Sequence, residues 1–335
     1  MFLLLACAGA PDSQRPDSED SAIDSEIETG ETGDSGETAD SGETADSGET
    51  ADSGETADSG ETDDSGADTG ALASTGPCLS YLDAVSMGSV DDSALNELSG
   101  LAVSRQNPGI LWTHEDSGGS PDLYALDFTG ATVATIHLEG VTNHDWEDIA
   151  IGPCDAGWCI VVGEIGTASY DHSVLTVEEP LITGDPTEFT VTPGVQAFSY
   201  PGDSEDAESL ALLPDGTPII VSKRTDATAG IYALTPDATV LEWLSDVPTG
   251  ASSEDLTARA TAADLSTDGT ALLLRTYLHL YSVDVTDITA PADPESLKFA
   301  LELQGEAVAW DPVQGGFWQV GEGTHPMLYY TGCES

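Results

Sequence analysis

The sequence predicts an all-β protein and, within that class, a β-propeller, on three observations. Beyond Cys78 the chain consists of short β-rich runs separated by Gly, Pro and Asp turns, and it shows no long amphipathic helical pattern. A motif that leads into an apolar run, clearest at Asp145–Ala150, recurs in weaker form along this region. The copies lie about 40–60 residues apart, a spacing typical of propellers and repeat arrays.

Each repeat divides into three or four expected strands, which gives five blades. The inner strands are expected at 98–103, 148–151, 209–213, 262–266 and 307–311. The second strands are expected at 110–114, 159–164, 218–222, 271–275 and 316–320, and the third at 122–127, 173–177, 230–234, 278–283 and 326–330. Outer strands are expected at 132–138, 189–192, 239–244 and 298–303. The longest interval, from Glu147 to Glu208, leaves room for a sixth, degenerate blade, but we expect five.

The chain divides into a leader (1–7), a linker (8–76) and the propeller domain (77–335). Between Glu31 and Gly66 the linker contains six consecutive hexapeptides related to Glu-Thr-Ala-Asp-Ser-Gly. Low hydrophobicity and like-signed charge in every unit predict a disordered, extended acidic spacer.

The segment Leu4-Leu5-Ala6-Cys7 resembles the lipobox of bacterial lipoproteins, which predicts a lipid anchor at Cys7. An ordinary signal peptide is the alternative. The apolar run is short and no Lys or Arg precedes it, so we expect the true start to lie upstream of Met1. Either leader predicts export, and the lipobox predicts attachment to a bacterial membrane, at the outer membrane or the cell surface.

The other four cysteines fit an oxidising compartment. Cys154 and Cys159 bracket a turn-like tetrapeptide between two expected strands, where a local disulfide would fit. Cys78 opens the propeller region and Cys333 nearly closes it, so a bridge between them would tie together the ends of a circular fold. Four cysteines allow three pairings, among which the sequence does not choose. A zinc site is the weaker alternative, because no second close Cys or His pair accompanies 154 and 159.

The composition is strongly acidic, with 62 acidic and 7 basic side chains and a formal charge of −55. This balance excludes a nucleic-acid-binding protein, because affinity for phosphate backbones depends on Lys and Arg. It fits bound divalent cations, a salty habitat or a strongly solvated surface. We expect a monomer.

Acidic residues stand at the starts of several expected inner strands. In an antiparallel meander the start of the first strand lies beside the end of the second, so these side chains should reach one face near the central channel. The inner strands of the first and fourth units begin instead with Ser99 and Ala263. Converging carboxylates repel one another unless a cation or protons intervene, and calcium prefers oxygen ligands. The predicted calcium ligands are Glu147, Glu208, Glu306, Asp148 and Glu97. The alternative is that these carboxylates cap strands and form salt bridges.

Second-strand ends supply the other candidates. Lys223 and Arg275 are assigned to matching positions of neighbouring units and are expected to steer an anionic group such as phosphate or carboxylate, together with Asp116 and Glu164.

Two histidines are candidates for catalysis. If hydrolysis occurs at the metal, His114 or His144 would be the acid or base. Alternatively, His144 packs near Trp146 and His114 hydrogen-bonds a loop. No Gly-x-Ser-x-Gly motif occurs, which argues against an α/β-hydrolase triad.

The ordered series Glu-Leu-Ser-Gly-Leu-Ala (97–102), Leu-Trp-Thr-His-Glu-Asp-Ser-Gly-Gly (111–119), Asp-Trp-Glu-Asp-Ile-Ala (145–150), Asp-Ala-Glu-Ser-Leu-Ala (206–211) and Gln-Gly-Glu-Ala-Val-Ala (304–309) resembles bacterial exported propellers. These are grouped with the esterase-like domain of certain phytases and with the SdiA-regulated family. The strand starts are also similar to the gluconolactonase and paraoxonase propellers, and that similarity implies calcium in the channel.

Two functional classes follow. The first is a surface-tethered binding or scaffold module for a small anionic ligand or a surface protein partner. The alternative is a calcium-dependent hydrolase of esters, lactones or phosphoesters.

Overall fold

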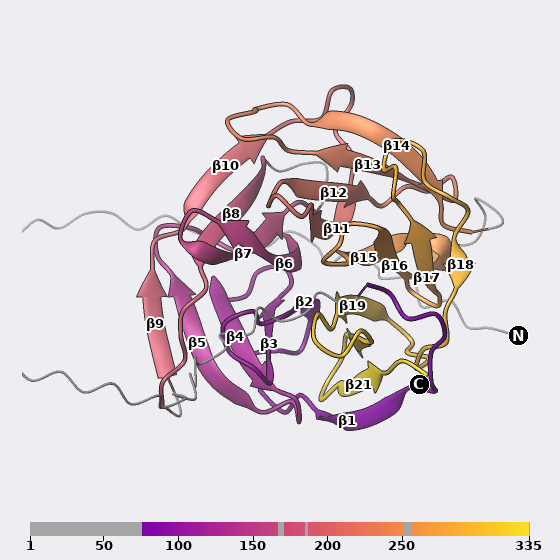
Figure 1. Ribbon diagram of the computed structural model, residues 1–335. Helices are drawn as coiled ribbons and strands as arrows, with labels where there is room; N and C mark the ends of the chain where they lie inside the picture. Colours follow the sequence, from indigo (N-terminus) through magenta and orange to yellow (C-terminus); the bar gives the residue numbers. More distant parts are fainter. Residues whose placement is uncertain (1–75, 167–170, 185–186, 251–255, 335) are drawn as a thin grey trace, which may run out of the picture. The chain divides into compact units, whose positions relative to one another are not determined.

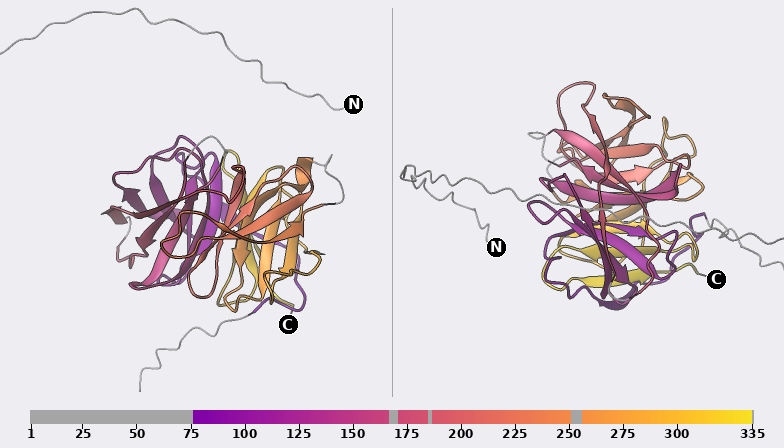
Figure 2. Two further views of the ribbon diagram at one scale, coloured as in Figure 1. Left: turned by 90° about the horizontal axis from the view of Figure 1, so that it is seen from above. Right: turned by 90° about the vertical axis from the view of Figure 1, so that its left-hand side faces the viewer.

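The computed structural model describes residues 76–166, 171–184, 187–250 and 256–334, so the predictions for the leader, Cys7 and the acidic spacer lie outside the described residues. The strands of these residues form five sheets arranged around a central axis (Figure 1). Figure 2 shows the same ring edge-on from two further directions. Among the described residues, no helix is long and apolar enough to span a membrane.

The five sheets are the five predicted blades. Blade 1 contains β2 (Leu98–Val103), β3 (Ile110–Glu115), β4 (Asp122–Asp127), β5 (Thr132–Leu138) and β9 (Thr187–Val191). Blade 2 contains β6 (Trp146–Cys154), β7 (Gly157–Glu164), β8 (His172–Glu178) and β10 (Gly194–Phe198). Blade 3 contains β11 (Ala207–Leu212), β12 (Pro218–Ser222), β13 (Thr228–Ala233) and β14 (Glu242–Pro248). Blade 4 contains β15 (Ala260–Leu265), β16 (Ala271–Thr276), β17 (Leu280–Asp284) and β18 (Glu295–Ser296), preceded by a short 3-10 turn, η1 (Leu256–Ala258). Blade 5 contains β19 (Gly305–Trp310), β20 (Phe317–Gly321), β21 (Met327–Thr331) and β1 (Val85–Ser89).

The outer strands of two blades differ from the prediction. The strand expected at 189–192 does not complete blade 2, because β9 pairs in parallel with β5 of blade 1, and β10 takes the outer position of blade 2. Phe189 and Val191 of β9 pack against the core between blades 1 and 2, which explains this choice. In blade 4 the prediction of an outer strand at 298–303 is wrong. The outer strand is only the two-residue β18, and Leu301 and Leu303 are exposed.

The ring of blades is closed by the first and last strands of the propeller domain. Strand β1 pairs antiparallel with β21 and completes the last blade. A disulfide joins Cys78 to Cys333, which confirms the predicted tie between the ends of the circular fold. A second disulfide joins Cys154 to Cys159 across the β6–β7 hairpin.

The core consists of five apolar clusters, each lying between two neighbouring blades. Every sheet therefore packs on both faces, and the central strands read as continuous apolar runs. Trp112 and Trp146 are fully buried between blades 1 and 2, and Trp318 is buried between blades 5 and 1. These tryptophans stabilise the contacts between blades.

Each inner strand carries a β-bulge near its start. The residues that the pairing with the second strand skips are Glu147, Glu208, Thr261 and Glu306, and in blade 1 the stretch Gly100–Leu101. Gly100 adopts φ +70°, and a Cβ there would lie 2.8 Å from the backbone nitrogen of Ile149 in the next blade. Only glycine fits this position.

Candidate functional site

The five bulges lie at the same end of the central channel and turn one residue of the inner strand out of its ladder in blades 2 to 5, and two in blade 1. Three of these residues are the predicted ligands Glu147, Glu208 and Glu306. In blade 4 the skipped residue is Thr261, two before the expected Ala263, and in blade 1 the skipped stretch Gly100–Leu101 directly follows the expected Ser99. The ring of acidic side chains is thus limited to blades 2, 3 and 5.

Glu147 is one of three carboxylates that form a cluster. Asp116, Asp145 and Glu147 each offer one oxygen, and these three atoms lie within 4.8 Å of one another. Asp116 Oδ1 and Asp145 Oδ2 are buried and have no hydrogen-bond partner among the described residues. Asp116 and Glu147 belong to the predicted site, whereas Asp145 was missed, although it stands two residues before Glu147 in the motif that first indicated the repeat. We call these residues the three-carboxylate cluster.

The loop between blades 1 and 2 fixes this cluster. Asn143 donates from Nδ2 to the carbonyls of Glu115, at 2.9 Å, and of Asp116. The amide of Asp145 donates to Glu164 Oε1 at 2.7 Å, and that of His144 to the other oxygen of Glu164 at 3.2 Å. The predicted ligand-binding residue Glu164 is thus buried, and both of its oxygens accept amide hydrogens from this loop.

Crowding of negative charge changes the acidity of the cluster. Burial, together with the charges of Asp116 and Asp145, raises the pKa of Glu147 well above its ordinary value. Burial and the charge of Asp145 raise the pKa of Asp116 to about 7. The cluster therefore holds protons near neutral pH, or it needs a cation to ionise fully.

Lys223 lies among the three bulge glutamates. It forms an ion pair with Glu208, and its Nζ lies 5.1 Å from the centre of the Tyr277 ring. Burial raises the pKa of Glu306 to about 8, and the charge of Lys223 opposes this rise, as it does for Glu147. The predicted salt bridge between a strand-start carboxylate and a base is present here, and Glu208 is not a member of the three-carboxylate cluster.

The prediction that Lys223 and Arg275 occupy matching positions is wrong. Lys223 follows Ser222, the partner of Ala207, and the equivalent residue of blade 4 is Tyr277. Arg275 lies two residues earlier, fully buried, with one guanidinium nitrogen 2.7 Å from Glu302 Oε2. The reason lies in the strand ends: β12 ends at Ser222, just before Lys223, whereas β16 continues to Thr276, one residue beyond Arg275.

Two predicted metal ligands, Asp148 and Glu97, do not belong to the three-carboxylate cluster. The carboxylate of Asp148 is fully buried and accepts hydrogen bonds from the amides of Ile149, Leu210 and Ala263, at 2.8, 2.9 and 3.2 Å. Asp148 therefore connects the inner strands of blades 2, 3 and 4. Glu97 is exposed at the mouth, and its carbonyl accepts the amide hydrogen of Asp116 at 2.7 Å.

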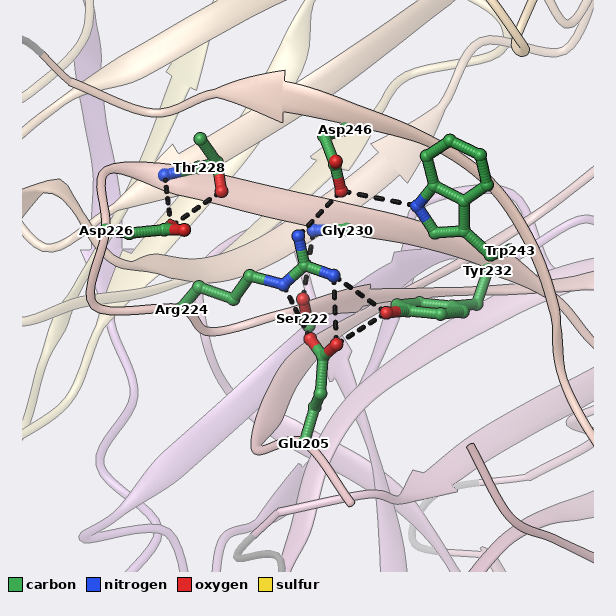
Figure 3. Close-up of polar contacts among 9 residues, drawn as sticks. All are labelled: Glu205, Ser222, Arg224, Asp226, Thr228, Gly230, Tyr232, Trp243 and Asp246. Carbon is green, nitrogen blue, oxygen red and sulfur yellow. Dashed lines mark hydrogen bonds and ion pairs between the residues drawn. The ribbon is translucent and has the colours of Figure 1, made fainter. Parts of the chain in front are cut away.

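Beside Lys223, the neighbouring Arg224 is held in a polar network on blade 3 (Figure 3). Its guanidinium binds both oxygens of Glu205, at 2.7 and 2.9 Å, and also contacts Asp246 at 2.6 Å and the Tyr232 hydroxyl at 2.7 Å. A surface cavity of about 360 Å³ is lined by Glu205, Asp206 and residues 223–226. The donors of Arg224 are therefore fully engaged. Of these two bases at the end of blade 3, Lys223 is the one that lies among the acidic residues of the channel.

The two candidate histidines have different surroundings. His114 is fully buried, contacts Trp146 edge-on at 5.8 Å between ring centres, and has its Nδ1 2.9 Å from the carbonyl of Glu115. Burial lowers its pKa to about 4. The His144 side chain is 56% exposed, with Nδ1 3.7 Å from Glu164 Oε2.

His114 should make the stability of the protein depend on pH. The unfolded chain takes up a proton near pH 6.5, whereas the folded protein keeps His114 neutral down to about pH 4. This residue's contribution is therefore complete above pH 6.5 and falls by about 3 kcal/mol as the pH drops to 4. Urea unfolding of the wild type and His114→Gln between pH 4 and 7.5 measures it. A stability difference between the two proteins that stays constant over this range would contradict the assignment.

The fold and the arrangement of the mouth define the class of protein, a five-bladed β-propeller with an acidic channel mouth. No protein-family model and no curated protein sequence matches the chain. Among solved structures, it is similar to the PQQ-bound aldose sugar dehydrogenase of Streptomyces coelicolor, with 12% sequence identity and a TM-score of 0.46. That alignment covers 75% of this chain and 98% of the dehydrogenase. The resemblance to the phytase-like and SdiA-regulated propellers stays a prediction.

Proposed function

We propose that the protein is an exported, surface-tethered binding module whose channel mouth holds a calcium ion in the three-carboxylate cluster. The observation that carries this proposal is the convergence of Asp116, Asp145 and Glu147, with oxygens within 4.8 Å of one another. Two of the carboxylates also keep a buried oxygen without a hydrogen-bond partner among the described residues. Leaving such atoms unpaired is unfavourable, and a bound cation would satisfy them.

The donor set favours calcium. All three groups are carboxylates, whereas zinc prefers nitrogen and sulfur ligands and magnesium requires near-ideal octahedral geometry. Calcium takes 6–8 oxygens, so three side chains leave positions for water or for the oxygens of a ligand. An anionic ligand could use these positions while Lys223 balances its charge.

A binding role is better supported than hydrolysis. His114 is sealed in the interface with Trp146 and stays neutral, so its environment does not favour exchange of protons with a substrate. A long acidic spacer at 8–76 would extend the reach of the domain towards a surface partner. The proposal for the whole chain is thus a tethered propeller that presents a calcium-organised mouth to a small anionic ligand or a surface protein.

Calcium should stabilise the chelator-treated protein. At 100 times its dissociation constant, a ligand that binds only the folded state adds about 2.7 kcal/mol. For a domain of this size that raises the Tm by about 5–10 °C. Glu147→Gln and Asp145→Asn should each abolish most of this shift, whereas Glu188→Gln on the exposed side of β9 should leave it unchanged.

Because protons compete with the cation for Asp116 and Glu147, the shift should also grow as the pH is raised from 6 to 8. Differential scanning calorimetry with calcium and with a chelator measures both effects. Equal Tm values in the two conditions, at every pH, would remove the cation site from the proposal.

A further inference from the structure

A second cavity lies at the opposite end of the channel, where the inner strands end. It has a volume of about 220 Å³ and is bounded by the ends of β6, β11 and β15, by Trp158 of the β6–β7 hairpin, and by Arg105, which follows β2. Most of the walls are apolar, from Ile151, Leu212, Pro214 and Leu265 among others. The volume lies below the roughly 300–1,000 Å³ of sites for drug-sized molecules, so this cavity suits a small ligand.

Arg105 is the basic residue of this cavity, and its backbone is held rigidly. The carboxylate of Glu179, which is 1% exposed, accepts hydrogen bonds from the amides of Arg105 and Gln106 at 3.2 and 3.1 Å. It also accepts hydrogen bonds from the Ser104 hydroxyl and, at 3.0 Å, from the Trp112 indole. A buried carboxylate of blade 2 thus fixes the turn that presents Arg105 to the channel.

The guanidinium of Arg105 is not used by the described part of the protein. It stacks over the Trp158 ring at 5.6 Å, its Nε is buried without a hydrogen-bond partner, and no described residue forms an ion pair with it. This is the reverse of Arg224, whose guanidinium is saturated by Glu205, Asp246 and Tyr232 (Figure 3).

Three nearby carboxylates keep Arg105 charged without occupying its donors. Burial lowers the pKa of Arg105, and the charges of Asp264, Glu179 and Asp311 oppose this. Each of these carboxylates already accepts hydrogen bonds elsewhere. Asp264 accepts the amides of Leu265 and Trp310, both at 2.8 Å, and Asp311 accepts the Trp318 indole at 3.2 Å. The structure therefore holds a half-buried cation with free donors at a cavity that Asp264 also lines.

We propose that this cavity binds a small apolar monocarboxylic acid, with its carboxylate on the guanidinium of Arg105 and its carbon chain against the apolar walls. A planar guanidinium matches a carboxylate through two parallel hydrogen bonds. A single negative charge suits the site, because Asp264 and Asp311 would repel a dianion such as phosphate. The site is independent of the calcium proposal, since it uses no residue of the three-carboxylate cluster.

Binding of 4-methylpentanoate to the full chain, measured by calorimetric titration in chelator, tests the proposal. The neutral 4-methylpentanamide has the same carbon skeleton and is the matched probe. We expect the acid to bind at least about tenfold more tightly than the amide, because only the acid forms charge-assisted hydrogen bonds with Arg105. Salt of about 0.15 M limits the repulsion between an anion and this acidic protein.

The variants separate recognition by Arg105 from general charge. Arg105→Met should weaken binding of the acid at least about tenfold and leave the amide unchanged, whereas Lys298→Met, at an exposed base of blade 4, should change neither. Arg105→Lys keeps the charge without the planar fork and should bind with intermediate affinity. If Arg105→Met does not fold, the comparison of acid and amide on the wild type still decides. Equal binding of the two probes, or no binding of the acid, would overturn the proposal.

Discussion

Asp148→Ala is expected to lower the free energy of unfolding by about 3–5 kcal/mol. The carboxylate accepts the amides of Ile149, Leu210 and Ala263 in a place with no access to water. Its removal leaves these buried amides unpaired, and each unsatisfied group costs about 1–3 kcal/mol. Since the three amides belong to three blades, the loss should affect the whole ring and not one sheet.

Urea unfolding followed by circular dichroism measures this loss. Asp148→Asn keeps one acceptor oxygen and should cost less than the alanine variant. Asp284→Ala is the matched control, since its exposed carboxylate accepts hydrogen bonds from the amide and the hydroxyl of Thr286, two residues along the same turn. An Asp148→Ala variant as stable as Asp284→Ala would show that the inner strands do not depend on this carboxylate.

Removing the disulfide between Cys78 and Cys333, with serine at both positions, is expected to destabilise the protein by about 5 kcal/mol. The bridge spans a sequence separation of 255 residues, so it restricts the unfolded chain far more than a local bridge does. The pair Cys154 and Cys159 spans only 5 residues, and the same chain-entropy relation gives about 2 kcal/mol for it.

The two double-serine variants therefore control for each other. Both lose one disulfide and two sulfur atoms, and they differ in the length of chain that the bridge closes. Urea unfolding of the wild type and both variants, under non-reducing conditions, gives the comparison. Equal losses in the two variants would mean that closure of the ring does not depend on the terminal bridge.

The sequence predicted the inner three strands of every blade because they pack on both faces and contain continuous apolar runs. It missed β1, whose Val85 and Met87 are exposed and whose sequence Val-Ser-Met-Gly-Ser has little apolar character. The outer strand of a blade is largely exposed to solvent, so it contains few apolar residues and its sequence pattern is hard to recognise. The assignment of 189–192 to blade 2 is wrong for the same reason, because the choice between two sheets depends on tertiary packing.

For the candidate site, sequence reasoning named Glu147 as a metal ligand and Asp116 as a ligand-binding residue, because carboxylates beside strand ends were the signal sought. It did not identify Asp145, which lies in the loop before the strand. It also misplaced Arg275, because β16 continues to Thr276, beyond the strand end that the sequence indicated, whereas Lys223 follows the end of β12. Arg105 carried no motif at all. Its significance arises from Glu179, 74 residues later, and from a cavity that several blades build together.

The position of the terminal disulfide has a mechanical consequence. Tension applied from the N-terminal side reaches Cys78 before it reaches β1 at Val85–Ser89. Through the covalent bond to Cys333, the load also passes to the residues that follow β21, so it does not fall on the hydrogen bonds between β1 and β21 alone. A propeller pulled on a tether would therefore not be opened strand by strand from its edge, and reduction of this one bond would expose the closing strand to peeling.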